Sequence, residues 1–272
     1  MATKLGLVGL PNAGKSTLFN ALTAGHAAVA PYPFTTTDRN VGVAVVDDAR
    51  LSALAQLLKP QRIIPTSIEF VDIAGLVKGA HQGEGLGNKF LSHVFGVDAL
   101  LHVVRCFEDD NVAHPMGGVD PRRDIEIIHT ELMLKDLEVL GRRREREQKL
   151  AKGGDKAAMK LLEHLQPWDA ALSAGTSIRS LGLAAEAAPH AFGIDLLSAK
   201  PVLYAANVGE GDLGKEPASV SSLNALIQAE GAQLVVFCAK LEAELAELDA
   251  ADRAEMMREL GVAESALPQV IR

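Results

Sequence analysis

The chain has 272 residues, of which 48% are hydrophobic and 23% are charged, so it is long and apolar enough to bury a full core. Its net charge of -8 argues against general nucleic-acid coating and sequence-specific DNA binding, and its two cysteines are too few for a disulfide framework. No apolar run approaches the ~18 residues that span a bilayer. Since a structured motif, not a signal peptide, follows the first residues, we expect a cytoplasmic protein without a membrane partner.

Short apolar runs alternate with helical stretches along the chain. We expect strands at residues 4–9, 41–46, 67–72, 99–105, 201–206 and 234–238. Helices are predicted between most of these runs, at residues 16–24, 51–58, 86–95 and 219–229. This alternation is typical of an α/β domain in which a mostly parallel sheet has helices on both faces.

One connection is too long for this alternation. The segment from Asp72 to Asn207 far exceeds the ~60 residues that two strand–helix units need. Its surplus has helical periodicity, broken at Gly153 and Gly154, and we interpret it as an inserted antiparallel helical hairpin. The predicted helices cover residues 125–150 and 156–172. We therefore expect one domain made of residues 1–129 and 200–272, and a helical, coiled-coil-like insertion at 130–199.

The insertion carries a run of charged residues, Arg-Arg-Arg-Glu-Arg-Glu-Gln-Lys, at positions 142–149. Opposite charges four residues apart are typical of a solvated helix face. The alternative is a basic strip that meets RNA or an acidic partner. The sequence leaves both interpretations open.

Residues 9–16, Gly-Leu-Pro-Asn-Ala-Gly-Lys-Ser, fit the phosphate-binding pattern G-x-x-x-x-G-K-[ST] between a predicted strand and a predicted helix. Glycines allow successive N–H groups to point at an anion, and the helix N-terminus adds partial positive charge. Lys15 is expected to reach the β- and γ-phosphates, and the Ser16 hydroxyl to bind Mg²⁺. The pattern predicts a P-loop NTPase fold. The predicted nucleotide contacts here are Asn12, Ala13, Gly14, Lys15, Ser16 and Thr17.

A second element supports this interpretation. Phe70-Val-Asp-Ile-Ala-Gly is an apolar strand that ends in an acid and then a glycine. Asp72 at the end of a strand can hold the hydration shell of the metal, and the N–H of Gly75 can sense the γ-phosphate. We therefore expect Asp72 to act with Ser16 at the metal, and Gly75 to act with Lys15 in catalysis.

The two motifs resemble those of the Obg-like translation-factor GTPases, and further segments are similar to the YchF, or Obg-like ATPase, branch. These segments are Pro-Phe-Thr-Thr at 33–36, Lys-Gly-Ala at 78–80, Gly-Glu-Gly-Leu-Gly-Asn-Lys-Phe at 83–90, His-Val-Val-Arg-Cys-Phe-Glu at 102–108 and Ala-Asn-Val-Gly-Glu at 206–210. The resemblance implies a G-domain-like fold and a Mg²⁺-dependent triphosphatase that works as a slow switch with the ribosome as its partner. That family has a C-terminal TGS domain after its nucleotide domain, so we expect this sequence to be part of a longer chain.

The resemblance also places the threonine of the first switch, a Mg²⁺ ligand, on Thr36, with Thr35 and Thr37 as close alternatives. Phe34, Thr35 and Thr36 are then expected to contact the nucleotide. Two other functions stay open: a GTP-specific GTPase of the Obg type in ribosome assembly, and a metabolic kinase. The kinase is disfavoured because the Asp-x-x-Gly motif is typical of a switch and the sequence has no obvious lid.

The base-specificity motif departs from the usual one. Guanine recognition normally needs Asn-Lys-x-Asp, whereas this chain has Asn207-Val-Gly-Glu210, without the lysine and with a longer acid. A displaced acceptor loses its discrimination for guanine, which favours ATP over GTP and keeps GTP as the alternative. Asn207 and Val208 are expected to border the base. Cys238, Ala239 and Lys240 are expected to close the pocket through backbone N–H groups, and Cys238 is interpreted as buried packing in preference to a reactive thiol.

The residue that orients the attacking water is not at its usual place. Leu76 follows Gly75 and cannot hydrogen-bond water. His114 lies in the loop after the strand at 99–105, and loops at such strand ends face the ligand, so His114 is the favoured candidate and His81 its rival. His114 as an exposed loop histidine is the alternative, and slow basal turnover is expected in any case. Asn12 is expected either to seat K⁺ beside the phosphates or to cap the loop.

Overall fold

The computed structural model describes residues 2–24, 41–46, 48–72, 96–215, 217–262 and 265–271. The predictions for Phe34, Thr35, Thr36, Thr37, Gly75, His81 and the helix at 86–95 lie outside these residues. The chain divides into two compact units. The first holds the described residues up to 72, residues 97–122 and the described residues from 202 onward, and the second holds Gly96 and residues 123–201.

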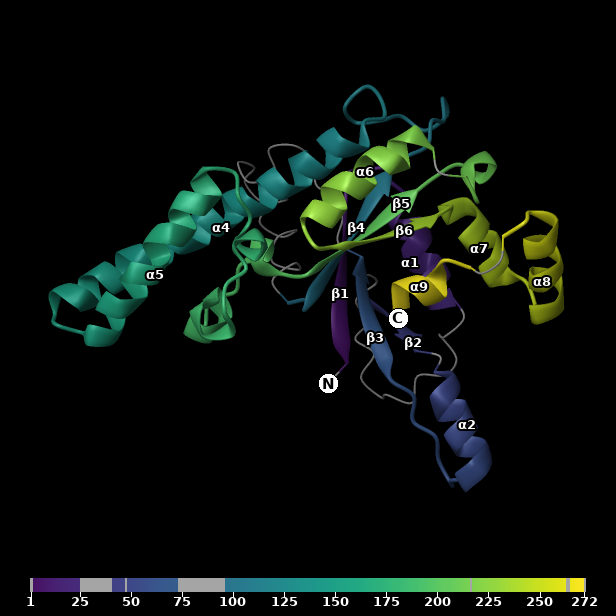
Figure 1. The fold of residues 1–272 in the computed structure, drawn as a ribbon, viewed down its shortest axis with the longest axis horizontal. Coiled ribbons are helices and arrows are strands. Elements are labelled where there is room, and N and C mark those ends of the chain that lie inside the picture. Colours follow the sequence, from purple (N-terminus) through teal and green to yellow (C-terminus); the bar gives the residue numbers. More distant parts are fainter. Residues whose placement is uncertain are drawn as a thin grey trace. The chain divides into compact units, whose positions relative to one another are not determined.

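A six-stranded sheet forms the centre of the first unit (Figure 1). Its strands in spatial order are β2 (Val41–Val45), β3 (Ser67–Asp72), β1 (Thr3–Val8), β4 (Ala99–Arg105), β5 (Val202–Asn207) and β6 (Gln233–Phe237). All neighbouring strands are parallel except β2, which is antiparallel to β3. The predicted α/β class and mostly parallel sheet are confirmed.

Side chains alternate between the two faces of each strand, and both faces are covered. On one face, Leu7 of β1 and Val103 of β4 join a buried cluster with Leu18 of α1 (Lys15–Ala24). Helix α7 (Ala239–Glu247) and the short α9 (Leu267–Ile271) contribute to the same cluster. On the other face, the buried Tyr204 of β5 donates a hydrogen bond from its hydroxyl to Glu230, which caps α6 (Ala218–Ala229), at 2.8 Å.

Two further helices of the first unit lie beside this framework. Helix α2 (Ala49–Leu58) begins after Asp48, whose carboxylate accepts the backbone N–H of Arg50, and this N-cap pairs with the first free donors of the helix. Helix α8 (Ala250–Glu259) has the same arrangement at Asp249. None of the helices in the described ranges is long and apolar enough to cross a membrane.

The carboxyl ends of the parallel strands meet at one edge of the sheet. In the strand register, Arg105 of β4 lies beside Asn207 of β5, and Asn207 lies beside Phe237 of β6. The backbone keeps these ends together beyond the strands, because Cys106 N–H donates to the Asn207 carbonyl at 2.8 Å and Val208 N–H donates to the Phe237 carbonyl at 2.8 Å. The loops that follow the strands therefore start from fixed positions at this edge.

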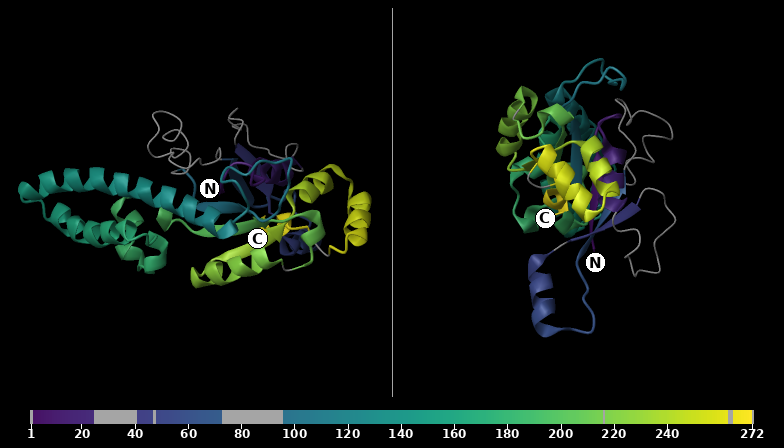
Figure 2. Two further views of the ribbon diagram at one scale, coloured as in Figure 1. Left: turned by 90° about the horizontal axis from the view of Figure 1, so that it is seen from above. Right: turned by 90° about the vertical axis from the view of Figure 1, so that its right-hand side faces the viewer.

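The second unit is built on a helical hairpin, as predicted (Figure 2). Helix α4 (Pro121–Lys152) and helix α5 (Lys156–Ser173) are joined by a turn in which Gly154 has a φ of +88°. The helices bury a shared cluster that includes Leu140, Leu165 and Trp168. Four short 3₁₀ helices follow between residues 178 and 199: η1 (Ile178–Leu181), η2 (Ala185–Ala187), η3 (Pro189–Phe192) and η4 (Leu197–Ala199).

A buried carboxylate holds the end of this segment against α4. Asp136 is fully buried and accepts the backbone N–H groups of Leu197 and Ser198 at 2.7 and 2.8 Å. Desolvation by burial raises the pKa of Asp136 to about 6, against these hydrogen bonds, which lower it. The carboxylate therefore supplies acceptors for two N–H groups at the start of η4, which would otherwise be unpaired.

The charged run at 142–149 forms ion pairs on the surface of the hairpin. Three of its arginines each pair with a carboxylate: Arg142 with Glu138, Arg143 with Glu147 and Arg144 with Asp169, at 2.8–2.9 Å. The last pair joins α4 to α5. At these three positions the side chains match a mixed-charge helix face rather than a basic strip.

Candidate nucleotide-binding site

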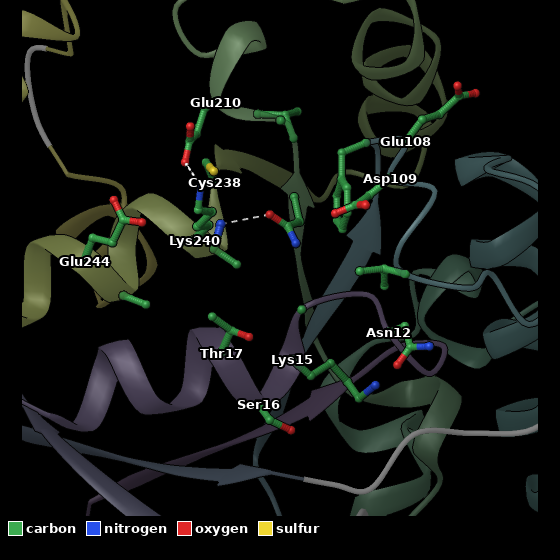
Figure 3. Close-up of a pocket in the computed structure, with 18 residues that line it drawn as sticks. Asn12, Lys15, Ser16, Thr17, Glu108, Asp109, Glu210, Cys238, Lys240 and Glu244 are labelled. Atoms are coloured by element: carbon green, nitrogen blue, oxygen red, sulfur yellow. Dashed lines mark hydrogen bonds and ion pairs between the residues drawn. The ribbon is translucent and has the colours of Figure 1, made fainter.

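A cavity of about 780 Å³ opens at the carboxyl edge of the sheet, entirely within the first unit (Figure 3). It is lined by residues from the glycine-rich loop and α1, from the loop after β4, from the loop after β5, and from α7. These are Asn12, Gly14, Lys15, Ser16, Thr17, Phe107, Glu108, Asp109, Val112, Asn207, Val208, Gly209, Glu210, Cys238, Ala239, Lys240, Ala243 and Glu244. The structure thus brings the glycine-rich loop together, in one cavity, with the predicted base-binding residues at 207–210 and 238–240.

The glycines of the loop at 9–16 are required by their surroundings. Gly9 has a φ of +150°, and a Cβ there would lie 2.3 Å from the carbonyl oxygen of Val103. Gly14 has a φ of +96°, and a Cβ there would lie 2.3 Å from the Asn207 side chain. Any larger residue would push the loop away from β4 and β5. Ala13, between them, is buried at 2% exposure and belongs to the core cluster.

Lys15, the first residue of α1, is buried at the floor of the cavity. Its Nζ donates to the carbonyl of Leu10 at 2.7 Å, within the same loop. Desolvation lowers the pKa of Lys15 to about 8, although the nearby Asp72 carboxylate raises it. In the part of the chain that the structure describes, the acceptor of this buried ammonium is a neutral carbonyl, which makes the group well suited to an anionic ligand.

Ser16 and Asp72, the two residues that the sequence analysis assigns to the metal, lie within hydrogen-bond distance of each other. The Ser16 hydroxyl donates to Asp72 Oδ2 at 2.9 Å, and this bond joins α1 to the end of β3. The other carboxylate oxygen, Asp72 Oδ1, is buried and has no hydrogen-bond partner in the ranges that the structure describes. Two hard oxygen donors and an unpaired buried acceptor are the ligand chemistry that Mg²⁺ prefers. No cluster of three or more His, Cys, Asp or Glu side chains forms a metal site elsewhere in those ranges.

Asn207 connects three segments of the site. Its Nδ2 donates to the Ala13 carbonyl at 3.0 Å, and its Oδ1 accepts from Ala239 N–H at 2.9 Å. The side chain is 3% exposed. Asn207 therefore fixes the glycine-rich loop to the start of α7, in addition to lining the cavity.

The far end of the cavity has an ion pair between two exposed side chains. Lys240 Nζ lies 2.9 Å from Glu210 Oε1, and the side chains are 71% and 46% exposed (Figure 3). The hydrogen bond and charge of Glu210 raise the pKa of Lys240. Beneath the pair, Cys238 is buried in a cluster with Leu241 and Leu245, and burial raises the pKa of its thiol. This environment matches the packing role expected of Cys238.

The loop after β4 supplies lining residues that the sequence analysis missed: Phe107, Glu108, Asp109 and Val112. The Arg105 guanidinium lies over the Phe107 ring at 4.5 Å and also donates to the Phe107 carbonyl, so the ring is held in place. The signal was available, because this loop starts from the same sheet edge that drew attention to His114.

His114 itself is not one of the residues that line the cavity. Its Nδ1 accepts the Met116 N–H at 3.1 Å, which leaves Nε2 as the protonated nitrogen of the neutral ring. The neighbouring Ala113 carbonyl accepts from Asn12 Nδ2 at 2.9 Å, and Asn12 has a φ of +63°. The Asn12 side chain thus joins the glycine-rich loop to the loop that carries His114.

Comparison with known proteins agrees with this site. A family described as 50S ribosome-binding GTPase matches residues 4–140. The chain is 46% identical over 274 residues to a protein of Bacillus subtilis strain 168, and 48% identical over 272 residues to one of Escherichia coli O157:H7, both named ribosome-binding ATPase YchF. Each comparison covers 100% of this chain and 75% of the relative.

A solved structure gives the same result in three dimensions. The YchF GTPase of Schizosaccharomyces pombe matches with a TM-score of 0.84 and 34% identity, over 99% of this chain and 74% of that one. The match includes both compact units. A structural similarity of this extent, at this sequence identity, indicates membership of one family and not only a shared topology. The chain therefore belongs to the YchF family of P-loop nucleoside triphosphatases.

Proposed function

We propose that the chain is a cytoplasmic, Mg²⁺-dependent triphosphatase that prefers ATP to GTP, turns over slowly, and reports its nucleotide state to the ribosome. The observation that carries the hydrolase chemistry is the arrangement of Lys15, Ser16 and Asp72 at one end of the cavity. The observation that carries the base preference is the ion pair between Glu210 and Lys240 at the other end.

At the phosphate end, Lys15 would exchange the Leu10 carbonyl for oxygens of the β- and γ-phosphates. Ser16 and Asp72 would hold Mg²⁺, with Thr36 as a further ligand from the first switch. Mg²⁺ would supply neutralisation of charge on the phosphates. Among the described residues, Asp72 Oδ1 has no hydrogen-bond donor, and this supports the assignment because a buried carboxylate oxygen without a donor is costly unless a ligand satisfies it.

For hydrolysis, we assign His114 to orient the attacking water and Gly75 to sense the γ-phosphate through its N–H. The bond from Met116 N–H to Nδ1 fixes the tautomer, so that Nε2 donates and can hold a water by its oxygen. Because the ring lies outside the cavity lining, the loop after β4 must bring it closer when nucleotide binds. This requirement accounts for the slow basal turnover that we expect.

At the base end, Phe107 offers an aromatic face for stacking, and Val208 an apolar wall. Glu210 replaces the aspartate that guanine specificity needs, and its carboxylate is engaged by Lys240. A carboxylate with its charge compensated is a weak acceptor for the two N–H donors of guanine, whereas adenine needs no such acceptor. The backbone N–H groups of Cys238, Ala239 and Lys240 would complete the pocket, although that of Ala239 is already bonded to Asn207.

The alternative is a GTP-specific enzyme of the Obg type. Calorimetric titration of ATP and GTP in the presence of Mg²⁺ separates the two, and GTP binding about tenfold tighter than ATP would overturn our assignment. The double substitution Val208→Lys and Glu210→Asp, which restores the guanine motif, is expected to raise GTP affinity about tenfold. No gain in GTP affinity would show that the base is selected in another way.

K⁺ and the ribosome are the two remaining components of the proposal. Turnover measured in K⁺ and in Na⁺ tests whether Asn12 seats a cation. Equal rates would assign Asn12 to loop joining alone, the role that its bond to Ala113 supports. The ribosome is proposed because relatives that align along the whole chain are named as ribosome-binding. Co-sedimentation with purified ribosomes, in ATP and in ADP, tests this partner.

A further inference from the structure

Arg105, the last residue of β4, is a buried cation that the proposed chemistry does not use. It is 3% exposed and lies on the same face of the strand as Val103, two residues before it, which packs in the cluster with α1. Its guanidinium stays charged, because the pKa of arginine is above 12. Among the described residues no carboxylate pairs with it, and its Nη1 is buried without a hydrogen-bond partner.

Burial of this cation costs free energy of folding that its bonds offset only in part. A buried charge is ordinarily paired with an opposite charge. Replacement of buried ionic groups by apolar side chains of similar volume often leaves a protein equally stable or more stable. At Arg105, two neutral backbone carbonyls stand where a carboxylate would be expected. Core packing therefore does not account for an arginine here, and we look for its role in the groups that it holds.

These groups belong to the start of the loop after β4. Arg105 Nε donates to the Phe107 carbonyl at 3.1 Å, and Nη2 donates to the Asp109 carbonyl at 3.4 Å. The guanidinium carbon lies over the Phe107 ring, 4.5 Å from its centroid. Phe107 and Asp109 line the cavity, whereas Arg105 is not one of its lining residues. The guanidinium thus supports the ring from behind, and the other face of the ring is open to a ligand.

This loop, marked by Glu108 and Asp109, and helix α7, marked by Lys240 and Glu244, lie on opposite sides of the cavity (Figure 3). A base that enters between them would meet the Phe107 ring, and stacking requires that the ring keep one orientation. We propose that Arg105 is a positioning residue for base binding, which acts by holding the Phe107 ring in the orientation that stacks on the base. This inference rests on the proposed function, which assigns Phe107 to stacking.

The rest of the loop is attached independently of Arg105. Asn12 Nδ2 donates to the Ala113 carbonyl at 2.9 Å and so joins the later part of the loop to the glycine-rich loop. Loss of the guanidinium leaves this attachment in place, and it leaves the phosphate end of the cavity untouched. We therefore expect a substitution of Arg105 to weaken binding of the base without weakening binding of the triphosphate. In hydrolysis, such a loss of ground-state binding raises KM and leaves kcat unchanged.

The test compares two ligands of the whole chain by calorimetric titration with Mg²⁺: ATP, which has a base, and inorganic tripolyphosphate, which has none. Arg105→Met removes the charge and both bonds, and Arg105→Lys keeps a charge near the ring but cannot donate in the same fork. The control is Arg253→Met, because Arg253 likewise donates from Nε and Nη2 to two backbone carbonyls, those of Leu245 and Leu248, and does not line the cavity. Unfolded protein lowers the stoichiometry of the titration and not the fitted Kd.

We expect Arg105→Met to bind ATP about tenfold more weakly and Arg105→Lys about threefold, with tripolyphosphate affinity within about twofold of the wild type. The KM for ATP should rise about tenfold in Arg105→Met while kcat stays within about twofold. Phe107→Ala should weaken ATP binding to a similar degree. The double variant should bind no more weakly than Phe107→Ala, because Arg105 acts only through the ring. Arg253→Met should bind both ligands as the wild type does.

Unchanged ATP affinity in Arg105→Met, or equal losses of ATP and tripolyphosphate affinity, overturns the inference. Additive losses in the double variant also overturn it, because Arg105 would then act without the ring. If Phe107→Ala leaves ATP affinity unchanged, the stacking assigned under the proposed function fails, and the inference fails with it. A loss in Phe107→Ala but not in Arg105→Met contradicts the inference alone. A wild type that binds GTP but not ATP contradicts the proposed preference, and the same comparison with GTP then decides the role of Arg105.

Discussion

At the phosphate end of the cavity, the ammonium group that would meet the ligand is buried and bonded to a backbone carbonyl, whereas at the base end the charged groups are exposed and bonded to each other. Lys15 is 6% exposed and bonded to a loop carbonyl. The Lys240 side chain is 71% exposed, and its partner is the Glu210 carboxylate, whose side chain is 46% exposed. The buried Lys15 side chain has few alternative conformations, whereas the exposed Glu210 and Lys240 side chains have many.

This contrast between the two ends of the cavity indicates where nucleotide specificity can change without loss of the fold. A substitution at the phosphate end disturbs contacts with β4, β5 and α7, because Gly9, Gly14 and Asn207 fill the space between these elements. A substitution of Glu210 or Lys240 at the base end disturbs only an ion pair in solvent, which contributes little to stability. We therefore expect free energies of unfolding to respond to the first group, and nucleotide preference to the second.

The largest effect is expected from Gly9→Ala. The new Cβ would lie 2.3 Å from the Val103 carbonyl oxygen, which is part of a central strand and cannot move away. We expect the free energy of unfolding to fall by about 4 kcal/mol from steric overlap and backbone strain. Urea denaturation followed by circular dichroism measures this loss. Tryptophan fluorescence is less suitable, because the single tryptophan, Trp168, lies in the other unit. Gly118→Ala, where a Cβ meets nothing within 4 Å, is the control. Equal stability of the two variants would mean that the loop is not rigid.

Asn207→Ala is expected to cause the next largest loss in the free energy of unfolding. It leaves the Ala13 carbonyl and the Ala239 N–H without partners in a buried place, at a cost of about 3 kcal/mol. Nucleotide affinity should fall too, since the loop is no longer tied to α7. Gln228→Ala, an exposed amide on α6, is the control and should change stability by less than about 0.5 kcal/mol. A loss as small as the control's would assign Asn207 to the cavity wall alone.

Much of the fold could be predicted because the strands are apolar runs with clear ends. The runs at 67–72 and 99–105 agree with the structure to the residue, and the remaining strands to within one residue at each end. The antiparallel direction of β2 could not be read from Val41–Val45, because apolar alternation is the same in both directions. Helix α4 starts at Pro121, four residues before the predicted helix, and a proline at the first helical position was the signal that was missed.

The site was predictable where a motif fixes residues close in sequence, as with Gly14, Lys15 and Ser16. It was not predictable where tertiary contacts decide the role of a side chain. The pairing of Glu210 with Lys240, and the two-sided bonding of Asn207, depend on the register of β5 with β6. The division into residues 1–129, 130–199 and 200–272 stays a prediction, as do the roles of His114 and of the switch residues.

A pH dependence of nucleotide affinity is the third expectation. Burial lowers the pKa of Lys15 to about 8, and bound phosphates would raise it again. Affinity should therefore be constant below pH 8 and fall as pH rises, because binding then requires uptake of a proton. Between pH 7 and pH 9 the loss should be about tenfold. Calorimetry at pH 9 in buffers of different ionisation enthalpy measures the proton uptake. Lys15→Met should bind weakly at both pH values, and a similar pH dependence in this variant would assign the proton to another group.

The smallest effect, and the sharpest test of the base end, is expected from Lys240→Ala. Removal of the ammonium frees Glu210 to accept from guanine, so the ratio of GTP to ATP affinity should rise about threefold while stability stays unchanged. Glu210→Gln should show no such rise, and the double variant should behave like Glu210→Gln, because the lysine acts only through the carboxylate. High salt should move the wild type toward Lys240→Ala, since an exposed ion pair is screened. Additive effects of the two substitutions would mean that Lys240 contacts the base directly. The ion pair between Glu210 and Lys240 would then not determine the nucleotide preference.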